Sequence, residues 1–157
     1  MKKFYMFIIF STAVFLVLAA CQQNKSQTKE NSEIKLVKTE VQDMQSSRDG
    51  ITVSMEKEKY KTTDNTITLN IQNNSGTELN YSSGFSLEKK INSTWFYVPI
   101  KEGRGVDDMG HRLPAKKTKS ETYSLDSLRD KLSPGKYRLI QNFGATYLAA
   151  PFEVVEP

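Results

Sequence analysis

From residue 51 onward, apolar and polar residues alternate along the chain. The alternation covers residues 51–55, 67–71 and 85–87, and further runs predict strands at residues 94–100, 118–125, 136–143 and 147–155. A period of two places every second side chain on one face of a strand, so the apolar face is buried and the other face is solvated. The pattern therefore predicts about seven strands in roughly 110 residues.

Turn residues separate these runs, as in Asn73-Asn74-Ser75-Gly76 and Pro134-Gly135. No long helical period lies between the runs, and only residues 126–132, which open with an acidic residue, are compatible with a turn or two of helix. Closely spaced strands without crossover helices are typical of an antiparallel arrangement. We expect an all-β fold, an antiparallel β-sandwich.

The first 20 residues follow a different pattern. Lys2 and Lys3 precede an apolar run that ends at Leu18, and two alanines follow it. This order of positive, apolar and small residues is typical of a secretory signal peptide. The alternative is an uncleaved membrane helix, since the run is close to the lower limit of about 17 residues for crossing a bilayer.

The next residue favours export. Leu18-Ala19-Ala20-Cys21 resembles the lipobox of bacterial lipoproteins. The resemblance implies that residues 1–20 are a lipoprotein signal peptide and that Cys21 carries the lipid as the first residue of the mature chain. The protein would then be lipid-anchored at the extracytoplasmic face of the cell membrane. A free or buried thiol that happens to follow a signal peptide is the alternative reading.

Residues 21–47 are predicted to form a lipidated polar tether. Between residues 22 and 47 there is no aromatic residue, glycine or proline, whereas all five prolines and all eight glycines lie at or after Gly50. The predicted folded domain is therefore residues 48–157. The spacing of Ile34, Val37, Val41 and Met44 is also compatible with a helical face, so the choice between helix and strand for residues 33–45 stays open.

Composition restricts the possible chemistry. Cys21 is the only cysteine and His111 the only histidine, so an intramolecular disulfide, thiol catalysis and Cys/His zinc sites are all excluded. The net charge is +4, and the two lysines of the signal peptide contribute part of it. Lysine and glutamate alternate elsewhere, so the basic stripe of a nucleic-acid-binding protein is missing. We predict no catalytic residues, no cofactor and no nucleic-acid partner.

The domain also resembles a known family. Ile67-Thr68-Leu69-Asn70-Ile71, the run Trp95-Phe96-Tyr97-Val98-Pro99 and Leu132-Ser133-Pro134-Gly135-Lys136-Tyr137 together resemble the bacterial immunoglobulin-like domain of small Gram-positive lipoproteins and surface proteins. The resemblance implies an immunoglobulin-like β-sandwich in the cell envelope, without defined catalytic residues. In such sandwiches a tyrosine at one corner returns its hydroxyl to a backbone group a few residues upstream, and Tyr137 is the candidate.

Two functions follow as expectations. The first is a non-catalytic binding domain that contacts a protein, peptide or glycan through a loop or a sheet edge. The alternative is a proteinase inhibitor that inserts the connection 101–117 into a protease cleft. That connection holds Glu102, Asp107, Asp108, Met109 and His111, but it lacks the alternating acidic positions of a calcium loop, so an ordinary loop is favoured over a metal site.

Overall fold

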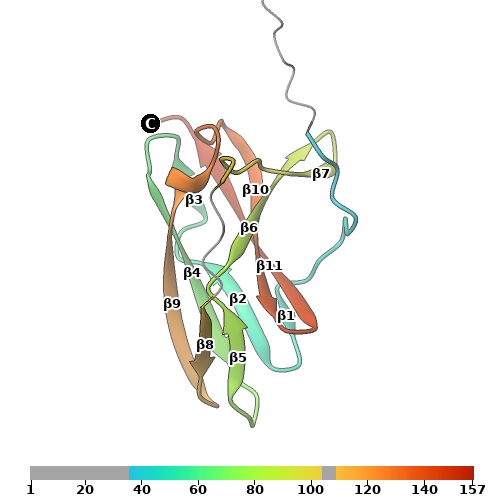
Figure 1. Ribbon diagram of the computed structural model, residues 1–157, viewed down its shortest axis with the longest axis vertical. Coiled ribbons are helices and arrows are strands. Elements are labelled where there is room, and N and C mark those ends of the chain that lie inside the picture. Colours follow the sequence, from blue (N-terminus) through green and yellow to red (C-terminus); the bar gives the residue numbers. More distant parts are fainter. Residues whose placement is uncertain (1–35, 104–108) are drawn as a thin grey trace, which may run out of the picture. The chain divides into compact units, whose positions relative to one another are not determined.

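A computed structural model describes residues 36–103 and 109–157, which all belong to one compact unit, Lys35–Pro157. The predicted signal peptide and Cys21 lie outside the described residues. The described residues of this unit form eleven strands and a single-turn 3-10 helix (Figure 1). No helix in the two described ranges is long and apolar enough to cross a membrane.

The strands form three sheets. The first sheet has the order β1 (Ser47–Arg48), β2 (Ile51–Met55), β4 (Thr66–Asn73) and β9 (Lys117–Ser124). The second has the order β3 (Lys59–Lys61), β11 (Thr146–Val155), β10 (Gly135–Phe143), β6 (Phe85–Ile91) and β7 (Thr94–Tyr97). All pairs are antiparallel except β3 with β11.

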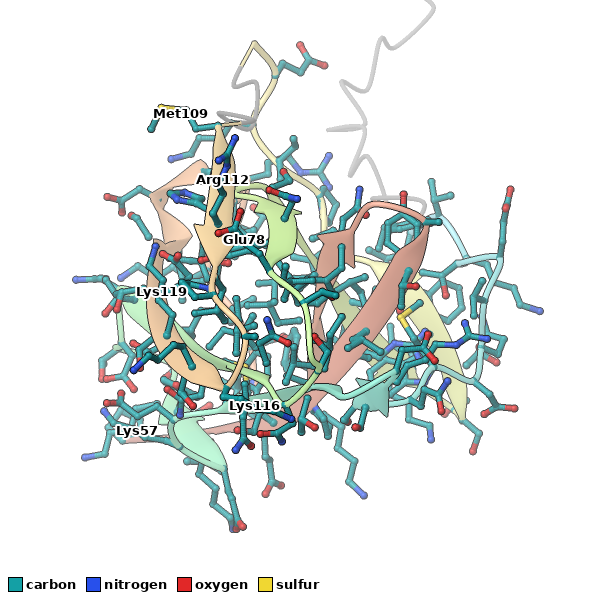
Figure 2. All side chains as sticks on the ribbon, turned by 90° about the horizontal axis from the view of Figure 1, so that it is seen from below. Lys57, Glu78, Met109, Arg112, Lys116 and Lys119 are labelled. Atoms are coloured by element: carbon teal, nitrogen blue, oxygen red, sulfur yellow. The ribbon has the colours of Figure 1, made fainter. Side chains whose placement is uncertain are left out.

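A third, two-stranded sheet pairs β5 (Leu79–Ser82) with β8 (Gly110–Leu113). Arg112 of β8 approaches Glu78, with 3.8 Å between the Nε and Oε1 atoms, and Met109 precedes the strand with 59% of its surface exposed (Figure 2). Tyr81 and Leu113 from this small sheet are buried in the main core. The third sheet therefore closes one side of the sandwich.

The core lies between the two large sheets. Ile67, Leu69 and Ile71 of β4 are fully buried, and so are Leu139 of β10 and Leu148 of β11. β4 alternates between buried and more exposed positions, as a strand with one face in a core must. In β10 five consecutive residues, 137–141, are buried, so part of its outer face is covered as well. The predicted all-β sandwich is confirmed.

The prediction of seven strands was incomplete. All seven predicted runs correspond to strands, and the structure adds β1, β3, β5 and β8. These four have between two and four residues, too few for alternation to show. The helical turn predicted for residues 126–132 is only a 3-10 turn at Leu125–Ser127, where the Ser124 hydroxyl caps the Asp126 N–H.

Part of the predicted tether is packed on the domain. Residues 38–46, here called the strap, pack along the second sheet and have no regular secondary structure beyond one bridge between Lys38 and Phe96. Thr39 donates its N–H to the Trp95 carbonyl oxygen at 3.0 Å, and Ala149 donates to the Gln45 carbonyl oxygen at the same distance. The tether assignment is therefore wrong for residues 38–46, and residues 36–45 form neither a helix nor a strand, apart from the single bridge at Lys38. Residues 21–35 lie outside the described part.

Candidate functional site

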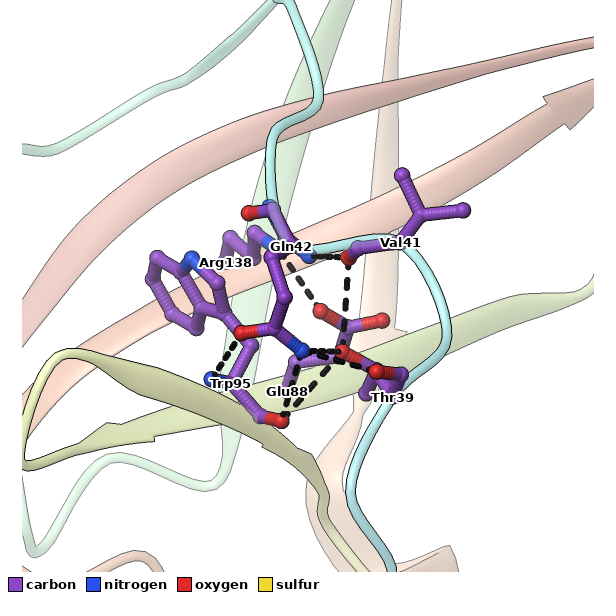
Figure 3. A network of polar contacts seen from close by, with 6 residues as sticks. All are labelled: Thr39, Val41, Gln42, Glu88, Trp95 and Arg138. Atoms are coloured by element: carbon purple, nitrogen blue, oxygen red, sulfur yellow. Dashed lines mark hydrogen bonds and ion pairs between the residues drawn. The ribbon is translucent and has the colours of Figure 1, made fainter.

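The strap is held by a buried polar network on the outer face of the second sheet (Figure 3). Arg138 of β10 forms an ion pair with Glu88 of β6, with 2.6 Å between Nε and Oε2, and both side chains are only 4% exposed. The other two guanidinium nitrogens donate to the carbonyl oxygens of Val41 and Gln42, at 2.6 and 2.9 Å. The guanidinium thus joins the sheet to the strap.

Gln42 completes the network from the strap side. Its Oε1 accepts a hydrogen bond of 2.8 Å from the Trp95 N–H, and its Nε2 donates to the Thr39 carbonyl oxygen at 2.7 Å. The Arg138 guanidinium lies 4.4 Å from the centroid of the Trp95 ring, within the range of a cation–π contact. Burying an ion pair costs free energy because both charges lose their hydration. The additional hydrogen bonds of the Arg138 guanidinium offset part of that cost.

A groove of about 880 Å³ lies between the strap and the sheet. Its lining includes Glu40, Asp43 and Met44 of the strap, Ser86 and Ile140 of the sheet, and Tyr97 and Tyr147. Tyr97 is 41% exposed and Tyr147 53% exposed. Exposed aromatic rings around a hollow are typical of surfaces that bind other molecules.

The aromatic run at residues 95–97 contributes to this site. Trp95 and Phe96 are partly buried, whereas Tyr97 is exposed at the groove. Trp95 contacts Arg138, and its ring centroid also lies 5.4 Å from the Lys90 ammonium. One ring of the run, that of Tyr97, is therefore exposed at the surface.

A second polar cluster lies where the small sheet meets β9. The Tyr81 hydroxyl donates to a Glu121 carboxylate oxygen at 2.5 Å, and the Lys119 ammonium is 2.7 Å from the same oxygen. Burial, together with the negative charge of Glu121, raises the pKa of Tyr81 well above its usual range. Burial would raise the pKa of Glu121, but the hydrogen bonds from Lys119 and Tyr81 outweigh it and lower the net pKa.

This second cluster is structural in character. Lys119 and Glu121 belong to an edge strand of the first sheet and share its inner side, because they pair in register with Ile71 and Leu69. Charges that point inward from an edge strand discourage pairing with a second chain. The three groups bond to one another at a single carboxylate oxygen, which is consistent with a structural role.

The outer face of the first sheet carries only uncharged polar side chains on its strands. They are Ser47, Thr52, Ser54, Thr66, Thr68, Asn70, Gln72, Thr118, Ser120, Thr122 and Ser124. Several bond to one another across strands, as Thr68 does to Thr122 at 3.0 Å and Ser120 to Asn70 at 2.7 Å. Part of the hydrogen-bonding capacity of this face is therefore used within the face itself.

The connection 101–117 does not stay irregular throughout. Residues 110–113 form β8, and His111 stacks on Tyr81 with 5.4 Å between ring centroids. Glu102 and Met109 are exposed, and Asp107 and Asp108 lie outside the described residues. The loop predicted as an inhibitory element is therefore shorter than expected, because β8 is tied to β5 by regular pairing.

Comparison with known proteins identifies the domain. The family model described as "Bacterial Ig-like domain" matches residues 47–153, which is more than half of the chain. The chain belongs to the bacterial Ig-like domain family. Domains of this family are generally non-catalytic, which supports a binding role. No curated protein matches the sequence.

Three solved structures with partial similarity belong to larger enzymes. A β-glucosidase of Erythrobacter marinus has 13% identity and a TM-score of 0.42, with 68% of this chain and 15% of that chain covered. The alkylpurine DNA glycosylase AlkC of Pseudomonas fluorescens has 10% identity and a TM-score of 0.39, with 67% and 30% covered. The Listeria innocua β-glucosidase bound to glucose has 17% identity and a TM-score of 0.37, with 66% and 16% covered. This chain thus spans less than a third of each protein.

The strap lies outside the family match, which begins at residue 47. The groove is therefore formed by a bacterial Ig-like domain together with a segment that precedes it. The sequence did not reveal Arg138 and Glu88, because a charged residue on the outer position of a strand is ordinarily solvated. It did not reveal Gln42, because that residue lies in a polar segment with the composition of a tether. The available signal was the apolar content of the strap, with Val41 and Met44 in a polar segment.

Proposed function

We propose that this protein is a lipid-anchored binding module of the cell envelope. Acyl chains on Cys21 hold it at the extracytoplasmic face of the cell membrane, and its bacterial Ig-like domain engages a partner in the groove between strap and sheet. The observation that carries the proposal is the groove itself, which combines exposed tyrosines with a wall fixed by the Arg138 network.

The fixed wall matters for binding. A loop that had to become ordered on binding would lose conformational entropy and weaken affinity. The strap is ordered already, because Arg138 and Trp95 both bond to its backbone. The groove is consequently a preformed site, as ligand sites usually are.

The anchor is tested by metabolic labelling with an alkyne analogue of palmitate. The full-length chain should be labelled and recovered with membranes, whereas Cys21→Ser should be neither labelled nor cleaved to the mature length. If the variant is processed at the same bond and remains in the membrane fraction, the anchoring part of the proposal is wrong.

The binding part is tested in cells with a photo-cross-linking amino acid at position 97. A defined adduct should form there and be absent when the same amino acid replaces Glu58, an exposed residue of the β2–β3 turn. Adducts of equal yield at both positions, or at neither, would contradict a partner in the groove.

A further inference from the structure

The groove has an excess of negative charge that its own structure leaves uncompensated. Glu88 is neutralised by Arg138, and Arg48, the one cation in the lining, forms an exposed pair with Asp49 at 3.9 Å. Among the described residues, the side chains of Glu40 and Asp43 have no ion pair or hydrogen bond. Two free carboxylates therefore line the groove of a chain whose net charge is +4.

The two exposed tyrosines lie at opposite ends of the groove floor. Tyr97 of β7 pairs with Glu88 of β6, and Glu88 pairs with Arg138 of β10. Tyr147 of β11 pairs with Asn142, which lies four residues after Arg138 on β10. The tyrosines are therefore separated by three strand spacings and by four residues along the strands. With about 4.8 Å between strands and about 3.4 Å per residue, they lie roughly 20 Å apart. An extended chain covers that distance with about six residues.

The spacing of Glu40 and Asp43 also suits an extended peptide chain. Glu40 and Asp43 are three residues apart, so their Cα atoms are separated by at most about 11 Å. In an extended peptide, side chains two residues apart project to the same face at a spacing of about 7 Å. The long arms of lysine or arginine can bridge the remaining distance, and their cationic ends can also lie over tyrosine rings.

We propose that the strap groove binds a short extended peptide segment with lysine or arginine at alternate positions. The cations pair with Glu40 and Asp43, and the ends of the segment contact Tyr97 and Tyr147. This inference rests on the proposed binding function and specifies the chemistry of the partner.

The probe is a fluorescent hexapeptide of alternating lysine and alanine, titrated with the full-length protein in a mild non-ionic detergent and followed by anisotropy. Peptides with glutamate or glutamine in place of lysine measure the contribution of charge. The Kd of the double variant Glu40→Gln/Asp43→Asn should rise about five- to tenfold, a value inside the range of about two- to thirtyfold for the loss of two solvent-exposed ion pairs. Tyr97→Ala and Tyr147→Ala should each weaken binding as well.

The matched control is Glu56→Gln/Glu58→Gln, which removes two exposed carboxylates from a turn outside the groove. It should leave the Kd unchanged. Since ions at 1 M screen charges beyond about 3 Å, high salt should weaken binding to the parent protein and have little effect on the strap variant. Unchanged melting temperatures would show that the variants are folded.

Two results would overturn the inference. One is equal binding of the lysine and glutamine peptides, and the other is a loss of affinity in the turn control as large as that in the strap variant. If instead a neutral hexamer of N-acetylglucosamine binds and depends on Tyr97 and Tyr147, the peptide assignment is wrong while the proposed binding function stands. That function fails separately, through the cross-linking experiment at position 97.

Discussion

The Tyr137 hydroxyl donates a hydrogen bond of 2.7 Å to the backbone carbonyl oxygen of Ser133. The ring is buried, stacks on Phe152 with 5.6 Å between centroids, and lies 5.3 Å from the Lys89 ammonium. This is the corner contact that the order Leu132-Ser133-Pro134-Gly135-Lys136-Tyr137 predicts. It fixes the turn that leads into the central strand β10.

Replacing this tyrosine by phenylalanine should destabilise the domain. Tyr137→Phe removes the donor and leaves the Ser133 carbonyl without its partner, which should cost about 1 to 3 kcal/mol. For a domain of this size the melting temperature should fall by several degrees. Thermal unfolding followed by circular dichroism measures the change.

Tyr147→Phe is the matched control, because Tyr147 is 53% exposed and should tolerate the loss of its hydroxyl. Tyr60 cannot serve this purpose, although no corner precedes it. Its hydroxyl bonds to both the N–H and the carbonyl oxygen of Thr68, at 3.2 and 3.3 Å. Equal melting of Tyr137→Phe and Tyr147→Phe would show that the corner bond contributes nothing.

Removing Arg138 should be severe. Arg138→Met leaves the Glu88 carboxylate buried without a partner, which should cost about 3 to 5 kcal/mol in urea unfolding. The double variant Glu88→Leu/Arg138→Met should recover most of this loss, because no unpaired charge remains. An equally unstable double variant would contradict the role given to the ion pair.

In the same double variant, the strap should be held less firmly even though the stability of the domain is largely recovered. The carbonyl oxygens of Val41 and Gln42 lose their donors even when the charges are gone. Hydrogen exchange of the Thr39 amide, which bonds to Trp95, should therefore become faster while amides in β4 keep their protection.

A fragment of residues 48–157 should fold cooperatively but melt below a fragment of residues 36–157. Without the strap, Val53 and Ala149 lose the carbonyl oxygens of Ser46 and Gln45 as acceptors, and Arg138 loses two acceptors of its own. At about 1 kcal/mol for each of these four bonds, the deficit should be on the order of 4 kcal/mol. Identical melting curves would show that the strap adds no stability.

Acidification should weaken the domain partly through Glu121. Its pKa is lower in the folded state than in the unfolded chain, so its stabilising effect is complete above the unfolded value and is lost as the pH falls through the folded value. A glutamate in the unfolded chain titrates near pH 4.5. As the pH falls below this value, the melting temperature of Glu121→Gln should therefore decrease less than that of the parent protein. The melting temperatures of both proteins between pH 7 and pH 3 provide the measurement, with Glu58→Gln as the control.

The long strands could be predicted from the sequence because burial on one face produces alternation that extends over five or more residues. Residues 67–71 are an example, and the turn at Pro134-Gly135 marks where the strand at residues 136–143 begins. The short strands β3 and β5 could not be predicted, because their pairing depends on partners far away in the sequence. Lys59–Lys61, for example, pairs in parallel with Glu153 to Val155.

The groove was beyond prediction for a related reason. A polar segment such as residues 38–46 has the composition of a tether, and only a buried cation on another strand reveals that its carbonyl groups are bound. Arg138 lies 96 residues after Gln42 along the chain. No local pattern in either segment encodes that contact.

The strap also determines how the domain would respond to mechanical force. When force is applied at Leu36, the contacts of Thr39 and Gln42 bear it first, because both residues precede β1 in the chain. Arg138 then passes the load to β10, which is paired with β11 on one side and with β6 on the other. Tension is thereby distributed across the middle of the sheet, and the strap would detach before any core strand is drawn out.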